Sequence, residues 1–487
     1  MSHHLRPAPT LLLGFLLTAV TAFPASAVAA DELLIGGATT SITPDRPVPL
    51  AGQMDTRISQ AVESPVTANV LALEARRGNQ ALDQAILISC DLAAIGGGII
   101  EPVRGRLKAA IADFDARKLI LSATHTHTAP VMEEGVYELP REGIIQPAEF
   151  RAFLIDRLAE IAIKAWKARK PGLAGWGLGH AVVAQNRRAV YADGHAQMYG
   201  DTTKPEFRRI EGYEDHGVEV LCFWDLKRNL LATAVNVPCP SQEVEARSTV
   251  NADFWHEVRE QLRARHGKNL LVLGWTGAAG DQSPHLMFRQ RAEERMRNLR
   301  GLTRLQELAR RIAAAWDEAY EGARREMHSD PLFVHKVQSI QLPARKVTSE
   351  ECAEARAKVA GLSKDPRNQW RVRWNQGVVD RFERQRSSPT PLCEMELHVL
   401  RLGDVAIATN PFELFTDFGI EIKARSPALQ TFLIQLTGPG ATYVPTERAE
   451  HGGGYSAIVQ SSTVGSEGGQ SLVDQTVQVL RELWAPK

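Results

Sequence analysis

The residues best suited to chemistry in this sequence are the two histidines of the segment His125-Thr126-His127. The apolar run 119–123 precedes them, so we expect them at the end of a buried strand. Side chains at positions i and i+2 of a strand point the same way, so both imidazoles could face one cleft. Imidazole nitrogens bind metal ions and transfer protons near neutral pH. The alternative is a buried pair with a structural role.

A second candidate is the loop 277–284, which is rich in small residues and contains Asp281 and Ser283. It follows the apolar run 270–275, which predicts another buried strand. Glycines let a backbone approach a ligand closely. Ser283 could act as a nucleophile assisted by Asp281. The alternative is a serine hydroxyl that caps a neighbouring backbone group.

Glu413 and Tyr443 are the remaining polar candidates. Glu413 opens a helical stretch, and Tyr443 lies in the loop that follows the predicted strand 431–436. Their oxygens could bind a metal ion, but sequence spacing does not show that the two side chains converge. A first-turn helix acid and a packed tyrosine are the alternatives.

Several common catalytic templates are missing from the sequence. There is no G-x-S-x-G elbow and no Walker A loop, and Glu260 stands where the second histidine of a zinc-binding helix beginning His256-Glu257 would be. The polar loops are therefore the remaining place for a site.

The elements that must position these loops alternate between strands and helices, which predicts the α/β class. We expect one large domain of mixed β-sheets flanked by helices, with the active site at strand ends. Predicted strands cover 66–73, 84–92, 119–123, 218–225, 231–237, 270–275, 395–402, 405–408 and 431–436. Predicted helices cover 101–114, 149–169, 254–266, much of 286–327, 349–362, a segment ending at 425, and a C-terminal stretch from about 470.

Composition and the N-terminal segment indicate which partners and which cellular compartment to expect. Lysine plus arginine and aspartate plus glutamate both number 57 among 487 residues, so no general positive field attracts nucleic acid. Residues 1–30 have a basic start, an apolar core and small residues, which is typical of a secretory signal peptide. We therefore expect residues 31–487 to be secreted or periplasmic. Five irregularly spaced cysteines indicate no disulfide scaffold.

Taken together, seven segments resemble the N-terminal catalytic domain of the neutral/alkaline ceramidase family. The resemblance spans nearly the whole mature chain, and the segments occur in the family's order. They are Gly36–Thr43 with Pro44 after it, Ser89–Leu92, Ser122–Pro130, Asn186–Arg188, Gly280–Pro284, Asn410–Glu413 and Tyr443–Glu447.

The resemblance implies an exported zinc hydrolase of N-acyl amide bonds, acting on an N-acylated small molecule or lipid with a peripheral contact to a membrane. In such an enzyme, zinc activates a water and polarises the amide carbonyl. The metal ligands that the resemblance implies are His125, Glu413 and Tyr443. The active-site residues are expected to be His127, Arg187, Asp281 and Ser283.

The sequence departs from the family pattern at one metal ligand. Where the family has a second histidine ligand, this chain reads Asn236 to Gln242 without one. Cys239 could replace it as a thiolate, and Gln242 could supply a weak oxygen ligand. Side chains from other loops are further alternatives, namely Asp253, His256 and His285.

Two other functions remain open, and one domain is not expected. A metal-free serine hydrolase would use Ser283, and a degenerate relative would bind a carbohydrate or lipid without turnover.

Family members commonly carry a C-terminal immunoglobulin-like domain, and we expect none here because about thirty residues follow Tyr455. The substrate is therefore not narrowed to a long-chain ceramide.

Overall fold

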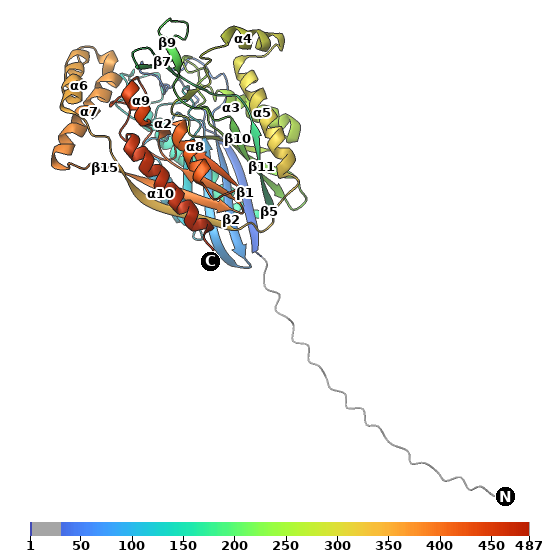
Figure 1. Cartoon of the computed structure of the whole chain (residues 1–487). Coiled ribbons are helices and arrows are strands. Elements are labelled where there is room, and N and C mark those ends of the chain that lie inside the picture. Colours follow the sequence, from blue (N-terminus) through green and yellow to red (C-terminus); the bar gives the residue numbers. More distant parts are fainter. Residues whose placement is uncertain (2–30, 487) are drawn as a thin grey trace.

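Two stacked β-sheets form the body of the molecule, and helices cover their outer faces (Figure 1). The computed structural model describes residue 1 and residues 31–486. The predicted signal peptide, residues 1–30, lies outside this described part except for residue 1. The predicted α/β class with mixed sheets is confirmed.

The larger sheet has eight strands in the order β12-β11-β10-β5-β1-β2-β3-β4. Neighbours are antiparallel except β3 with β4 and β11 with β12, which are parallel. The strands are β1 (Asp31–Ser41), β2 (Thr67–Arg77), β3 (Gln80–Cys90), β4 (Leu119–Ala123), β5 (Lys170–His180), β10 (Gly217–Asp225), β11 (Leu230–Val237) and β12 (Leu271–Thr276).

The smaller sheet has four strands in the order β14-β15-β16-β18. Its strands are β14 (Phe333–Pro343), β15 (Leu392–Leu402), β16 (Val405–Thr409) and β18 (Gln430–Ile434). Short ladders complete the loops: β6 (Gln185–Asn186) with β13 (Gln282–Ser283), β17 (Glu413–Leu414) with β19 (Tyr443–Val444), and β7 (Arg188–Tyr191) with β8 (Ala196–Met198) and β9 (Phe207–Ile210).

The helices are α1 (Ile100–Ala110), α2 (Pro147–Lys167), α3 (Phe254–His266), α4 (Gln290–Leu299), α5 (Arg304–Ala323), α6 (Ser349–Leu362), α7 (Gln369–Ser387), α8 (Thr416–Arg425), α9 (Glu447–Gly452) and α10 (Ser466–Trp484). Two short 3₁₀ helices are Ala116–Lys118 and Pro366–Asn368. Helices α5 and α6 begin with capping boxes, in which a threonine and the side chain three residues later satisfy each other's backbone N–H groups.

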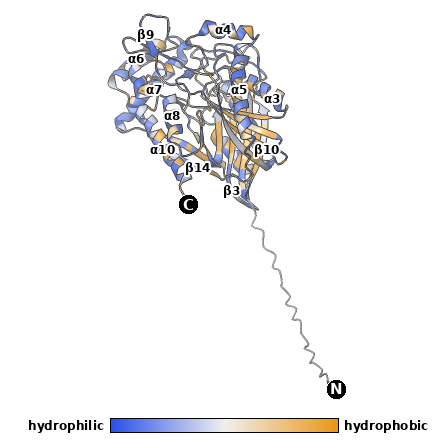
Figure 2. Cartoon of the chain, turned by 45° about the vertical axis from the view of Figure 1, so that its right-hand side comes forward, coloured by the Kyte–Doolittle hydropathy of each residue, from blue (hydrophilic) through white to orange (hydrophobic). Residues whose placement is uncertain are grey.

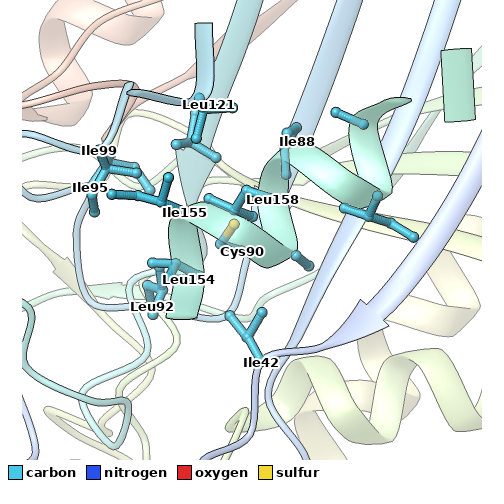
Figure 3. Packing of buried hydrophobic residues seen from close by; sticks show 14 of the residues in the cluster. Ile42, Ile88, Cys90, Leu92, Ile95, Ile99, Leu121, Leu154, Ile155 and Leu158 are labelled. Atoms are coloured by element: carbon cyan, nitrogen blue, oxygen red, sulfur yellow. The ribbon is translucent and has the colours of Figure 1, made fainter. Parts of the chain in front are cut away.

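Strands in the middle of the larger sheet, such as β2, are apolar on both faces because both faces are covered (Figure 2). In β2, Val70 and Ala72 belong to a buried cluster under α1 and α2, whereas Leu71 and Leu73 belong to the cluster between the two sheets. Figure 3 shows α2 packed over β3 and β4 in the first cluster. Such continuous apolar runs are typical of strands with both faces buried.

Glycines allow α5 to lie unusually close to β5. A Cβ on Gly177 would lie 2.1 Å from the carbonyl oxygen of Ala319, and one on Gly179 would lie 1.9 Å from that of Ala315. Any other residue would therefore push the helix away from the strand. The glycine-rich sequence of β5 is thus explained by the helix that covers it.

The ends of three strands meet where the polar loops begin. Thr276, the last residue of β12, donates through its hydroxyl to the carbonyl oxygen of Ala123 at the end of β4, 3.5 Å away. The chain that leaves β18 runs between these two edges, because Gln435 N donates to Thr276 O and Ala123 N donates to Leu436 O at 3.0 and 3.3 Å. Loops from both sheets therefore begin at one place.

A side-chain amide also joins the two sheets. Asn236 of β11 donates to the carbonyl oxygen of Leu433 in β18 at 2.8 Å, and its own oxygen accepts from the Leu433 N–H at 3.2 Å. The side-chain amide of Asn236 thus makes the same pair of hydrogen bonds with β18 that a backbone peptide group of a neighbouring strand would make.

In the described part of the chain, no helix is long and apolar enough to cross a membrane.

Candidate active site

The histidine segment follows β4 directly, but it is not a strand. His125 has the left-handed backbone angle φ +64°, which L-residues rarely adopt. This turn, rather than strand alternation, brings the two imidazoles together, and their Nε2 atoms lie 3.1 Å apart. His125 Nδ1 donates to the carbonyl oxygen of Ala93 at 2.6 Å, so its Nε2 is turned toward His127.

Glu413 and Tyr443 lie side by side on the short parallel ladder of β17 and β19. Glu413 Oε2 is 3.3 Å from His125 Nε2. Both side chains are almost fully buried. The structure therefore brings together the three residues for which the resemblance implied metal binding.

The pKa values of this group follow from burial and charge. Burial would lower the pKa of His125, but the adjacent Glu413 carboxylate raises it above the ordinary value. Burial lowers the pKa of His127, although Glu245 opposes this. Burial, together with Glu413, raises the pKa of Tyr443 well above its ordinary value, so its phenol keeps its proton.

Arg187 stands behind Tyr443 and is 3% exposed. Its Nη2 donates to the Tyr443 hydroxyl at 3.1 Å and to the carbonyl oxygen of Gly280 at 3.0 Å. Its guanidinium also lies 5.9 Å from the centre of the Tyr199 ring. Arg187 therefore supports Tyr443 with a buried positive charge.

Ser283 is close to this group, but its hydroxyl is engaged elsewhere. Its Oγ lies 3.0 Å from the Tyr199 hydroxyl, accepts from the backbone N–H of His285 at 3.1 Å, and lies 3.4 Å from Gln242 Nε2. None of these three partners is an imidazole or a carboxylate that would take its proton.

Asp281 does not face the histidines. One of its carboxylate oxygens accepts from Asn186 Nδ2 at 2.7 Å, and the other accepts from the backbone N–H and the hydroxyl of Thr416 at 2.9 and 2.7 Å. These bonds tie the loop after β12 to β6 and to the start of α8. Asp281 thus supports the loop rather than the reacting atoms.

Glu245 and Tyr199 belong to the same group and were not predicted. Glu245 Oε2 lies 3.0 Å from His127 Nδ1, which is ion-pair range although the two atoms are not aligned as a regular hydrogen bond. Its Oε1 lies 3.7 Å from His285 Nε2. The only hint in the sequence was a carboxylate three residues after Gln242.

The residues do not complete the four-ligand zinc site that the resemblance implies. Burial, with Asp253 and Glu243 nearby, raises the pKa of Cys239 well above its ordinary value, so its thiol keeps the proton and donates to Pro240 O at 3.4 Å. Gln242 turns its Nε2 to Tyr199 at 2.8 Å, whereas its buried Oε1, the atom considered as a weak ligand, has no hydrogen-bond partner.

Of the other candidates for the fourth ligand, His285 and Asp253 are bonded to the backbone, and His256 lies at a different cavity. His285 Nε2 lies 2.9 Å from the carbonyl oxygen of Gln242, which places its proton there. Asp253 caps α3 and accepts from Val244 N at 2.9 Å. His256 lines a separate cavity together with His285. Residues 31–486 contain no group of three or more His, Cys, Asp or Glu side chains placed to hold a metal ion.

A cavity of about 330 Å³ opens onto the histidine pair. Its lining combines small residues, larger apolar side chains and four aromatic residues. The polar groups that reach it include His125, His127, Glu413 and Tyr443. The aromatic residues are Tyr137, Trp370, Tyr443 and Tyr455. Such a mainly apolar cavity with a few convergent polar groups is typical of a small-molecule site.

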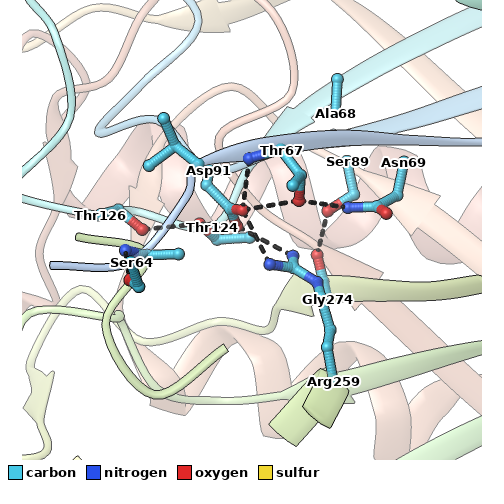
Figure 4. A network of polar contacts seen from close by, with 12 residues as sticks. Ser64, Thr67, Ala68, Asn69, Ser89, Asp91, Thr124, Thr126, Arg259 and Gly274 are labelled. Carbon is cyan, nitrogen blue, oxygen red and sulfur yellow. Dashed lines mark hydrogen bonds and ion pairs between the residues drawn. The ribbon is translucent and has the colours of Figure 1, made fainter. Parts of the chain in front are cut away.

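A buried polar network holds the histidine segment from below (Figure 4). Arg259 of α3 donates to both carboxylate oxygens of Asp91 at 2.7 and 2.9 Å. The same carboxylate accepts from the backbone and hydroxyl of Thr67, both at 2.9 Å, and from Thr124 Oγ1 at 3.4 Å. The strand ends that carry the histidines are therefore fixed by a charged pair.

No protein-family model matches the sequence, and no curated protein is significantly similar to it. Solved structures do share its fold. The neutral ceramidase from Pseudomonas aeruginosa aligns with a TM-score of 0.66 at 15% identity, over 93% of this chain and 75% of that one. A ceramidase complexed with C2 aligns with a TM-score of 0.65 at 14% identity, over 93% and 76%. At this identity the likeness shows the fold.

Proposed function

We propose that this protein hydrolyses the amide bond of an N-acylated small molecule or lipid at the cavity lined by His125 and His127. The observation that carries the proposal is the histidine pair, which lies between two carboxylates, Glu413 and Glu245, and lines a mainly apolar cavity. The fold shared with ceramidases supports the same reaction class.

In the proposed reaction, His127 takes a proton from the attacking water. Its lowered pKa leaves the imidazole unprotonated near neutral pH, and Glu245 beside Nδ1 favours the tautomer that carries its proton on Nδ1 and none on Nε2, the nitrogen that lies 3.1 Å from His125 Nε2. The water oxygen bonds to the carbonyl carbon, and the C–N bond then breaks. The proton passes from His127 to the leaving nitrogen, which gives a carboxylic acid and an amine.

Tyr443 supplies the stabilisation of the developing oxyanion. Its phenol keeps its proton, and Arg187 donates to the phenol oxygen at 3.1 Å, which makes the hydroxyl a stronger donor. Arg187 does not line the cavity, so we assign it a positioning role. The zinc-activated water predicted from the resemblance stays a prediction, because only three of the four residues expected as its ligands have a counterpart in this chain.

The test is hydrolysis of a panel of N-acyl amides with short and long acyl chains, measured by release of the free amine. His127→Gln should lower kcat/KM by about a hundredfold or more. His180→Gln, at a side chain that is 63% exposed and remote from the cavity, serves as the control. Equal activity in the two folded variants would exclude His127 as the base.

The missing fourth ligand favours one second candidate, which is a protein that binds such a compound without turnover. It predicts saturable binding of an N-acyl ligand, measured by calorimetry, with no product released. Hydrolysis above the level of His127→Gln would remove this candidate. The metal-free serine mechanism is less well supported, since Ser283 contacts no base.

A further inference from the structure

Helix α4 turns its polar side to the protein and its apolar side to solvent. None of its residues is buried. The side chain that faces inward is Glu293, which forms an ion pair with Arg311 of α5. Arg297, one turn later on the same side, is also only partly exposed. A surface helix ordinarily packs its apolar stripe on the core, so this orientation is reversed.

The outward side carries an apolar stripe formed by Phe288, Ala292, Met296 and Leu299. Spacings of four and three residues place Ala292, Met296 and Leu299 on one side of α4, and Phe288 lies two residues before the helix begins. Phe288, Met296 and Leu299 are 36%, 42% and 66% exposed. In Figure 2, α4 lies at the edge of the molecule and shows hydrophobic and hydrophilic colours side by side.

Arginines border this stripe on both sides. At 100° per residue, Arg291 and Arg295 lie along one border and Arg300, the C-cap, along the other, whereas the guanidinium of Arg289, just before the helix, lies 4.6 Å from the centre of the Phe288 ring. The segment 288–300 contains five arginines and two glutamates, a net charge of +3, although the whole chain is neutral. The outward side of α4 is therefore strongly basic.

We propose that α4 docks on an anionic lipid surface, with the apolar stripe at the boundary between headgroups and acyl chains and the arginines on lipid phosphates. A short helix with an apolar stripe between basic borders has the features of an interfacial helix. A second copy of this chain is a poorer occupant, because it would bring another segment of charge +3 against the first.

The docking helix is joined closely to the candidate active site. Ser283 and His285 lie in the same short stretch of chain as Phe288. Met287 fixes the junction, since its N–H donates to Gln185 Oε1 at 2.8 Å and its carbonyl oxygen accepts from Thr202 Oγ1 at 3.2 Å. Docking would therefore hold this loop at the lipid surface. Lipid binding itself does not depend on the proposed hydrolysis.

The experiment is co-sedimentation of the purified protein with vesicles of phosphatidylcholine, alone or mixed in equal parts with phosphatidylglycerol. Binding is expected only to the mixed vesicles and should weaken with added salt. Arg291→Gln/Arg295→Gln should weaken it about 25-fold, at about fivefold per arginine near an anionic surface. Phe288→Ser/Leu299→Ser should also abolish most of the binding.

Matched controls change exposed residues of the same kinds outside α4. Arg324→Gln/Arg325→Gln removes two arginines that are 52% and 79% exposed, and Leu226→Ser/Leu429→Ser removes two leucines that are 63% and 75% exposed. Both should bind vesicles as the wild type does. All four variants should keep the unfolding temperature of the wild type, because none of the changed side chains is buried.

Three results would overturn the proposal. One is failure of the wild type to bind the mixed vesicles at low salt, and another is equal binding by the α4 variants and their controls. The third is a dimer in light scattering that Phe288→Ser/Leu299→Ser dissociates, since a second copy would then be the occupant. Failure to find a hydrolysed substrate leaves all of these measurements valid.

Discussion

Replacing Gly52 by alanine should displace His127 while leaving the fold intact. Gly52 has φ +93°, and a Cβ placed there would lie 2.4 to 2.7 Å from the Cβ, Cγ and Nδ1 atoms of His127. Ordinary carbon contacts are about 3.5 Å or more, so the imidazole must move by about 1 Å. It has no free direction, because His125 and Glu245 lie 3.1 and 3.0 Å from its two nitrogens.

A displacement of this size at a reacting group costs about a hundredfold in kcat/KM. Gly98→Ala is the matched control, because Gly98 has a similar φ of +79° and open space within 4 Å of an added Cβ. Both variants carry the left-handed strain of about 1–2 kcal/mol. The measurements are amine release from an N-acyl substrate and urea unfolding. If Gly52→Ala folds and stays as active as Gly98→Ala, the assigned position of His127 is wrong.

Three further predictions concern stability and metal content. Arg259→Leu leaves the buried Asp91 carboxylate unpaired and should lower the free energy of unfolding by about 3–5 kcal/mol in urea titrations. Adding Asp91→Asn should restore part of this loss. A loss below about 1 kcal/mol would show that the ion pair is not effectively buried. Burial raises the pKa of Asp253 to about 7, so its contribution to stability is complete below about pH 4 and falls by about 1.4 kcal/mol per pH unit as pH rises toward 7. Asp253→Asn should remove this slope from the urea data, and an unchanged slope would argue against the shift. Zinc should be substoichiometric after dialysis, by elemental analysis, because the fourth ligand is lacking; firmly held stoichiometric zinc that disappears in His125→Ala would contradict this.

Local patterns predicted the elements whose residues face a core on a regular period. The helix 254–266 and the helix 349–362 were predicted at their observed limits, as α3 and α6. Strand β5 was not predicted, since its alternate glycines indicate a turn unless the approach of α5 is known. Strand β14 and helix α7 were also not predicted.

The site was only partly accessible from sequence. The resemblance grouped His125, Glu413 and Tyr443, and the structure places them together, although their roles stay predictions. Glu245 and Tyr199 were missed because their partners lie tens of residues or more away along the chain. The reason given for the histidine pair was also wrong in detail, since a left-handed turn at His125 replaces the expected strand alternation.

The amide of Asn236 helps to fix the distance between the two halves of the site. The histidines leave the edge of one sheet, whereas Glu413 and Tyr443 come from segments next to the other. Asn236 and the layer in which Trp275 meets Phe432 at 6.2 Å hold those sheets in register. The distance between the Glu413 carboxylate and the His125 imidazole thus depends on the thickness of the packed layer between the two sheets. A change of volume deep in that layer would retune the chemistry without touching any residue that contacts the substrate.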